Sequence, residues 1–140
     1  MENLETQTLN EKKKFLKRYK RMTAIINRLE EKLARVDERM YKIKSPNFSS
    51  EPKGGTPVTM EDLLSEKMEL EERINRLIKK SRVIRQEILD KIDELDDVRY
   101  GEVLEAFFIE CKDFQQIADD TGYTVRHVIR LYSEGIRLMS

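Results

Sequence analysis

Few residues of this chain carry the chemistry of catalysis, and those few do not form a group. The 140 residues include one histidine, His127, and one cysteine, Cys111. An activated nucleophile needs a base within hydrogen-bond reach, and no Ser/His/Asp or Cys/His pattern with supporting spacing can be assembled. The acidic residues from Asp90 to Asp97 have no His or Cys nearby, so they indicate a solvated helix end and not a metal site. We therefore expect no enzyme, no catalytic residue, no bound metal and no cofactor.

Arginine side chains offer a different chemistry, the recognition of nucleic acid. Arg126 and Arg130 are four residues apart, so a helix would place them one turn apart on one face. Arginine to guanine is the commonest base-specific contact. Thr124 precedes this helix as an expected N-cap, and its hydroxyl or amide could also meet a phosphate. The candidate DNA-binding residues are Thr124, Arg126, His127, Arg130, Ser133 and Arg137.

A second set of cations lies near the N-terminus, where seven of ten residues are Lys or Arg. Three interpretations remain open for them: a solvated helix face, contact with the DNA backbone, or pairing with the acidic second helix. The candidate phosphate contacts are Lys12, Lys13, Lys14, Lys17, Arg18, Lys20 and Arg21.

Composition narrows the class of protein. The chain has 27 Lys+Arg, 27 Asp+Glu and a mean hydropathy of −0.67. Residues 1–44 hold 13 cations against 7 anions, whereas residues 60–97 hold 8 against 12. No apolar run approaches the roughly 18 residues that span a bilayer, and the N-terminus has no signal-type stretch. The lone cysteine cannot form an internal disulfide, so we expect a cytoplasmic protein without membrane contact.

Two long helices are predicted for the first two thirds of the chain, over about 10–44 and 60–95. Apolar residues recur at alternating steps of four and three, which is typical of a coiled-coil seam. In the first helix the seam is Phe15, Tyr19, Met22, Ile26, Leu29, Leu33, Val36, Met40 and Ile43. In the second helix it is Leu63, Lys67, Leu70, Ile74, Leu77, Ser81, Ile84, Ile88, Lys91 and Leu95.

The connection over 45–59 contains all three prolines of the chain and two glycines, so it cannot continue a helix. A loop of this length reverses the chain, which predicts an antiparallel helical hairpin over 1–95. Thr59 and Asp62 resemble a capping box and place the start of the second helix near Met60. A flanking apolar stripe (Leu64, Met68, Ile78, Leu89 and Ile92) would face water in an isolated hairpin, so we expect a homodimer.

The last 45 residues, 96–140, are predicted to form a three-helix module. Asp97 can cap a helix from Val98, whose expected apolar face is Val98, Val103, Leu104, Phe107, Phe108 and Cys111 as a buried thiol. Asp113 can cap Phe114–Thr121, and Thr124 a last helix from Val125 to about Met139. Ala118 is small enough for a helix crossing, Gly122 tolerates φ > 0 at a tight turn, and Val128 points back to the crossing. This spacing predicts a helix-turn-helix, and Gly135 in the last helix indicates close packing.

Residues 99–139 resemble the region 4 module of bacterial sigma factors. They are more similar to the ArpU- and RinA-like late-transcription activators of phages of Gram-positive bacteria, and the order of the helices also looks like a related phage family of unknown function. The resemblance implies sequence-specific binding of double-stranded DNA near a promoter, in the cytoplasm of an infected or lysogenic host, with host RNA polymerase as a partner. The chain departs from the sigma pattern because Val125–Ser140 has a net charge of only +2. Dimerisation or the basic stretch would have to add phosphate contacts.

The leading hypothesis is therefore an all-α, dimeric, phage- or prophage-encoded transcriptional regulator that reads DNA with its last helix. One alternative is a DNA-packaging component of the small-terminase type, which would form a large ring. Another is a coiled-coil adaptor that binds RNA polymerase or another protein without DNA.

Overall fold

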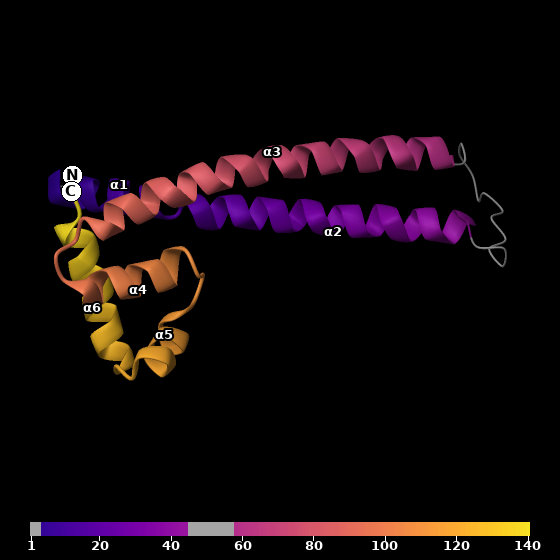
Figure 1. Ribbon diagram of the computed structural model, residues 1–140. Helices are drawn as coiled ribbons and strands as arrows, with labels where there is room; N and C mark the ends of the chain where they lie inside the picture. The colour runs from indigo at the N-terminus through magenta and orange to yellow at the C-terminus, as the bar shows by residue number, and fades with distance from the viewer. Residues whose placement is uncertain (1–3, 45–57) are drawn as a thin grey trace. The chain divides into compact units, whose positions relative to one another are not determined.

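The computed structural model describes residues 4–44 and 58–140, and these residues form α-helices joined by short connections (Figure 1). The helices are α1 (Leu4–Leu16), α2 (Arg18–Lys44), α3 (Met60–Asp93), α4 (Val98–Phe108), α5 (Phe114–Thr121) and α6 (Val125–Leu138). The chain divides into two compact units, 4–23 with 81–140 (unit 1) and 24–44 with 58–80 (unit 2). Most of the predicted loop, 45–57, lies outside the described residues. The predicted functional division at residues 95 and 96 stays a prediction.

Unit 2 consists of the antiparallel parts of α2 and α3 (Figure 1). The predicted seam is buried at Ile26, Leu29, Val36, Leu63 and Ile74. Burial of these branched side chains removes apolar surface from water and holds the pair together. On the rim of the seam, Lys67 Nζ lies 2.8 Å from Asp37 Oδ1.

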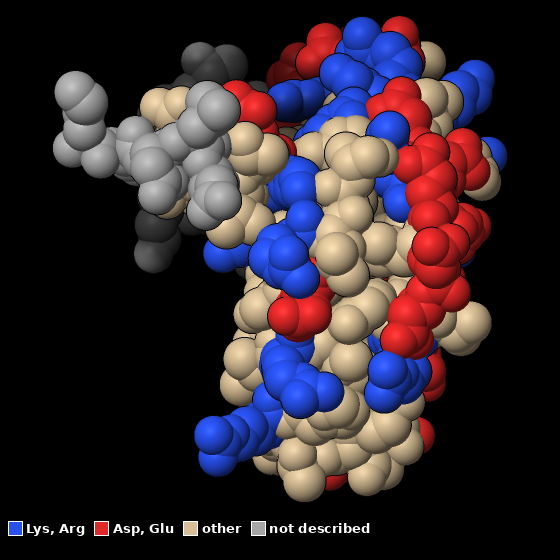
Figure 2. Space-filling view, turned by 90° about the vertical axis from the view of Figure 1, so that its left-hand side faces the viewer, with Lys and Arg blue, Asp and Glu red and all other residues tan. Residues whose placement is uncertain are grey.

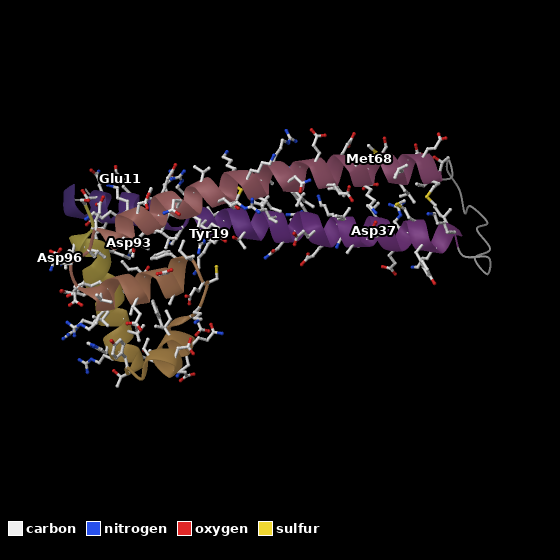
Figure 3. The ribbon with its side chains drawn as sticks, viewed as in Figure 1. Glu11, Tyr19, Asp37, Met68, Asp93 and Asp96 are labelled. Atoms are coloured by element: carbon white, nitrogen blue, oxygen red, sulfur yellow. The ribbon has the colours of Figure 1, made fainter. Side chains whose placement is uncertain are left out.

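The Asp37–Lys67 ion pair shows which turns of the two helices lie opposite each other. Figure 3 shows Asp37 of α2 and Met68 of α3 at the same level of the pair. The hydrogen bond to Asp37 raises the pKa of Lys67 above its ordinary value. Two members of the predicted flanking stripe, Leu64 and Met68, are exposed.

Helix α3 begins where the capping residues of the sequence predict. The backbone N–H of Thr59 donates to Asp62 Oδ2 at 3.2 Å, and the N–H of Asp62 donates to Thr59 Oγ1 at 3.1 Å. This reciprocal pair satisfies two amides that the first helical turn leaves without a partner. The predicted cap and the predicted start at Met60 are both confirmed.

The N-terminal part departs from the single helix expected over 10–44. Helix starts at Leu4, and a turn residue, Lys17, separates α1 from α2. The hydrogen bonds from Lys17 N to Lys13 O and from Arg21 N to Lys17 O continue across it, each at 3.0 Å, so the chain bends without unwinding. Leu16, which lies outside the predicted seam, is fully buried next to this bend.

Unit 1 contains two apolar clusters. The first brings α1 and the last turns of α3 onto α4 and α6: Leu16, Ile84, Ile88, Ile92, Leu104, Phe108, Ile109, Ile136 and Met139. The second lies between α4, α5 and α6: Val103, Ile117, Ala118, Val128 and Leu131. Ile92 was expected on an exposed stripe, but it is 1% exposed because it belongs to the first cluster. Leu89 packs partly against the same cluster, so this end of the stripe needs no second copy to cover it.

Two expectations for the apolar face of α4 are wrong. Val98 is 79% exposed because it occupies the first position after the cap, before the helix packs on its neighbours. Cys111 is exposed and not buried. The helix ends at Phe108, so Cys111 lies in the following turn with φ +58 and is no longer on a helical face.

The N-cap of α4 is Asp97, as predicted from the sequence. We expect its contribution to the free energy of unfolding to be lost in acid. Asp97 Oδ1 accepts from the backbone N–H of Arg99 at 2.9 Å, and Asp97 Oδ2 lies 2.8 Å from Arg99 Nη2. The bonds from the Arg99 side chain and then from its amide lower the pKa of Asp97 below 3.8. A lowered pKa means that the stabilisation is complete above the unfolded-state value and is lost as pH falls through the folded-state value.

We therefore expect Asp97→Asn, which retains a capping oxygen but no charge, to unfold at lower urea than the wild type near pH 7. At an acidic pH below the folded-state pKa of Asp97 the gap should close, because Asp97 is then protonated in the wild type. Urea unfolding followed by circular dichroism at the two pH values measures the difference. A gap that does not narrow in acid would contradict the assigned ionic cap.

Candidate nucleic-acid interface

The candidate interface is carried by α6, which α5 and a short turn precede. Asp113 caps α5 in a full capping box, with Asp113 Oδ1 accepting from Gln116 N and Gln116 Oε1 accepting from Asp113 N, both at 2.8 Å. The observed bounds of α5, Phe114–Thr121, are the predicted ones. Gly122 ends the helix with φ +81 and donates its N–H to Ala118 O at 2.9 Å. Thr124 then caps α6 through its Oγ1, which accepts from His127 N at 3.1 Å.

The left-handed backbone at Gly122 gives a testable prediction. A Cβ there would meet no atom within 4 Å, so Gly122→Ala changes only the backbone strain and not the packing. We expect a loss of about 1–2 kcal/mol in the free energy of unfolding, measured in urea. Gly101→Ala is the matched control, because its Cβ would lie 3.5 Å from Ile92 Cγ2 inside a helix, in ordinary contact. The control should be neutral or more stable by up to about 1 kcal/mol. Equal effects at the two sites would contradict the role of the turn.

The buried face of α6 fixes which side chains it presents. Val128, Leu131, Gly135 and Ile136 are buried against α4, α5 and α1. A Cβ at Gly135 would lie 3.0 Å from Leu104 Cδ1 and 3.2 Å from Tyr100 Cβ, which confirms that this glycine permits close packing with α4.

Three aromatic rings of α4 and α5 support α6 through its Tyr132. Tyr132 lies 5.0 Å from Phe107, 5.7 Å from Phe108 and 5.1 Å from Phe114 between ring centroids. Burial among these rings raises the pKa of Tyr132. Aromatic contacts of this kind hold α6 in one orientation relative to the rest of unit 1.

The opposite face of α6 is open. Arg126, Arg130, Ser133 and Arg137 are all exposed. Arg126 and Arg130 make no ion pair with any residue of 4–44 or 58–140, whereas Arg137 Nη2 lies 3.7 Å from Glu134 Oε2. Two guanidinium groups at the N-terminal half of α6 are thus available to an external partner.

Two further residues complete this surface. His127 is half-buried, and its ring lies perpendicular to that of Tyr123 with 5.0 Å between the centroids, so part of the imidazole is covered within the protein. Ile129, which the sequence argument did not select, is 42% exposed and lies one turn from Arg126 and Ser133. In the sequence, only its spacing of three residues from Arg126 and four from Ser133 could have indicated that it shares their helix face. An apolar side chain among arginines suits contact with a thymine methyl group.

Three of the seven N-terminal cations have partners inside unit 1. Lys12 Nζ donates to the carbonyl of Arg137 at 3.0 Å. This carbonyl lies at the C-terminal end of α6, where the helix dipole favours a cation. Arg18 Nη1 lies 2.7 Å from Glu87 Oε2, and Lys20 Nζ lies 3.8 Å from the centre of the Phe107 ring. Within the described part of the chain, no ion pair involves the others: Lys13, Lys14, Lys17 and Arg21.

Two acidic side chains of unit 1 gather around Lys112, in the connection between α4 and α5. Lys112 Nζ lies 2.8 Å from Asp120 Oδ2 and 3.0 Å from Glu110 Oε2. These two carboxylates, Asp120 first, raise the pKa of Lys112 to about 12. Figure 2 shows Asp and Glu side chains aligned along one edge of the face in view, with other residues across its middle and Lys and Arg side chains at its top and toward its opposite side.

Comparison of the chain with models of protein families, with curated proteins and with solved structures finds no match. None of the helices in 4–44 and 58–140 is long and apolar enough to cross a membrane.

Proposed function

We propose that this chain is a sequence-specific, double-stranded-DNA-binding transcriptional regulator whose α5 and α6 form a helix-turn-helix, with α6 as the recognition helix. The observation that carries the proposal is the exposed pair Arg126 and Arg130, one turn apart on a helix whose other face is buried. A helix of this kind fits the major groove, where arginine reads guanine through O6 and N7.

The local geometry supports this role. Thr124 caps α6, so the positive end of the helix dipole lies beside the candidate arginines of the first turns. Such a helix start binds phosphate oxygens and orients the helix on the duplex. Gly122 and the capping box at Asp113 fix α5 relative to this start.

The regulator belongs to a phage or prophage and acts as a homodimer in the cytoplasm of its bacterial host. This part of the proposal relies on the resemblance of residues 99–139 and on the exposed apolar side chains Leu64 and Met68. A dimer would add phosphate contacts to a C-terminal module whose own charge is slightly negative. Host RNA polymerase is the protein partner that the resemblance implies.

Selection of bound fragments from phage and host genomic DNA tests the proposal, at about 50–100 mM salt, where phosphate contacts are strong. Enrichment of one or a few sites is the expected result. The solution mass, measured in parallel, should be that of a dimer. Uniform recovery of all fragments would contradict a sequence-specific regulator. A large ring would instead favour DNA packaging, and no DNA binding with capture of polymerase would favour an adaptor.

A further inference from the structure

The charge on α3 is sharply divided along its length. Its first 13 residues, 60–72, contain six Asp or Glu and a single Lys, the Lys67 paired with Asp37. The next eight, 73–80, contain four Lys or Arg and no acidic residue. All of these residues belong to unit 2. Because the helix is nearly neutral overall, its composition as a whole hides this division.

Three of the four cations share one row of α3. Arg73, Arg76 and Lys80 each directly precede a seam position, so they lie along one flank in successive turns of about 5.4 Å. All three are exposed, and together with Leu77 they line a notch of about 250 Å³.

Helix α2 extends the same flank. In an antiparallel helix pair, a twofold axis perpendicular to the plane of the two helix axes exchanges the two helices. Residues that directly precede seam positions therefore lie on the same flank of the pair in both helices. Arg28 and Lys32 directly precede Leu29 and Leu33 and are exposed. The Asp37–Lys67 pair sets the segment of α2 around Arg28 opposite the segment around Arg76. We call Arg28, Lys32, Arg73, Arg76 and Lys80 the hairpin patch.

No acidic residue lies among the cations of the hairpin patch on this stretch of the flank. Glu30 directly follows a seam residue and therefore lies on the other flank, and Glu31 points to the outer side of α2. The remainder of the flank, nearer the loop, is balanced instead: Arg35, Arg39 and Lys42 on α2 face the row Asp62, Glu66 and Glu69 on α3. Positive charge is therefore concentrated at one end of the hairpin flank.

We infer that the hairpin patch is a second DNA-binding surface, which contacts the phosphate backbone of the duplex without reading its sequence. No ion pair or hydrogen bond within the described residues occupies the five side chains, and guanidinium groups bind phosphate oxygens in bidentate fashion. A protein partner would need apolar anchors at its centre, and the exposed apolar side chains of this flank, Ile25 on α2 and Val83 on α3, both lie beyond the cations and not among them. The choice of DNA as the polyanion rests on the proposed function, whereas the surface itself is independent of α6.

The test is the salt dependence with which the full-length chain binds a random-sequence duplex. Each phosphate contact contributes about 0.9 to the slope of log K against log salt. Replacing Arg73, Arg76 and Lys80 together by glutamine should lower that slope by about 2–3 and weaken binding by about 10- to 100-fold near 100 mM salt. The three side chains are exposed, so helicity measured by circular dichroism should not change.

The matched control replaces Arg35, Arg39 and Lys42 by glutamine, which removes the same charge from the same flank where acidic residues already balance it. Its slope should stay within about 0.5 of the wild type. Equal slopes for both variants would overturn the inference. So would a wild type that binds no random duplex, or a patch variant whose solution mass changes, because the patch would then be a protein interface.

The same measurements separate this inference from the proposed regulator. If the salt slope depends on the hairpin patch but no genomic site is enriched, the sequence-specific function is contradicted and the hairpin patch is supported. If a genomic site is enriched but both variants have equal slopes, the hairpin patch is contradicted and the sequence-specific function is supported.

Discussion

Replacing Arg126 and Arg130 together by alanine is expected to abolish recognition of the selected DNA site. Each well-placed arginine–guanine pair contributes about 1–3 kcal/mol of discrimination, so the double variant should lose about 2–6 kcal/mol, roughly 30- to 20,000-fold in affinity. Binding to random-sequence duplex should weaken far less, because phosphate contacts elsewhere remain. Titration of the selected and a scrambled duplex at one salt concentration gives both numbers.

The control for this variant is Arg35→Ala with Arg39→Ala. These arginines are also exposed, four residues apart and on a helix, but they belong to α2. The control should retain the specific site within about threefold, a difference well under 1 kcal/mol. Both variants should keep the helicity and the solution mass of the wild type. Undiminished preference for the selected site in the Arg126 and Arg130 variant would sink the assignment of α6 as the recognition helix.

The ends of the helices could be predicted because their causes are local. Thr59 and Asp62, Asp97, Asp113 and Thr124 all cap where the sequence placed them, since a cap requires only one or two nearby amides. Gly122 was equally predictable, because few other residues tolerate φ +81 at low cost.

The partners of the helices could not be predicted, because they depend on residues far away in the sequence. Leu16 and Ile92 are buried by α4 and α6, which no periodicity within their own helices signals. The bend at Lys17 interrupts a seam that the apolar repeat carries on without a break. Cys111 was misplaced because the helical pattern of α4 continued past the point where the helix ends.

The candidate interface was predictable on its outer face and not in its surroundings. The spacing of Arg126 and Arg130 indicates a shared helix face wherever α6 packs. That Lys12 reaches the end of α6 and that Lys20 covers Phe107 follows only from the tertiary fold. The hairpin patch was missed for another reason: charges summed over 60–97 are net acidic, and this sum hides the basic segment 73–80 between acidic turns.

Replacing Phe108 by alanine is expected to have the largest effect on stability. Phe108 is fully buried, lies edge-on to Phe107 at 4.9 Å and stacks on Tyr132 at 5.7 Å, so the change leaves a cavity between α4 and α6. Removal of a buried phenylalanine costs about 3–5 kcal/mol. A domain of this size is stabilised by about 5–15 kcal/mol, so much of the margin disappears. Thermal unfolding followed by circular dichroism should shift down by more than about 10 °C.

Val98→Ala is the control on the same helix, because Val98 is 79% exposed and its side chain leaves no cavity. Its unfolding free energy should stay within about 0.5 kcal/mol of the wild type. DNA binding should be lost in Phe108→Ala once unit 1 unfolds and should return on cooling, whereas the Arg126 and Arg130 variant stays folded and does not regain the site. A Phe108→Ala protein as stable as the Val98→Ala control would show that α4 and α6 do not pack as described. The orientation assigned to the open face of α6 would then also be wrong.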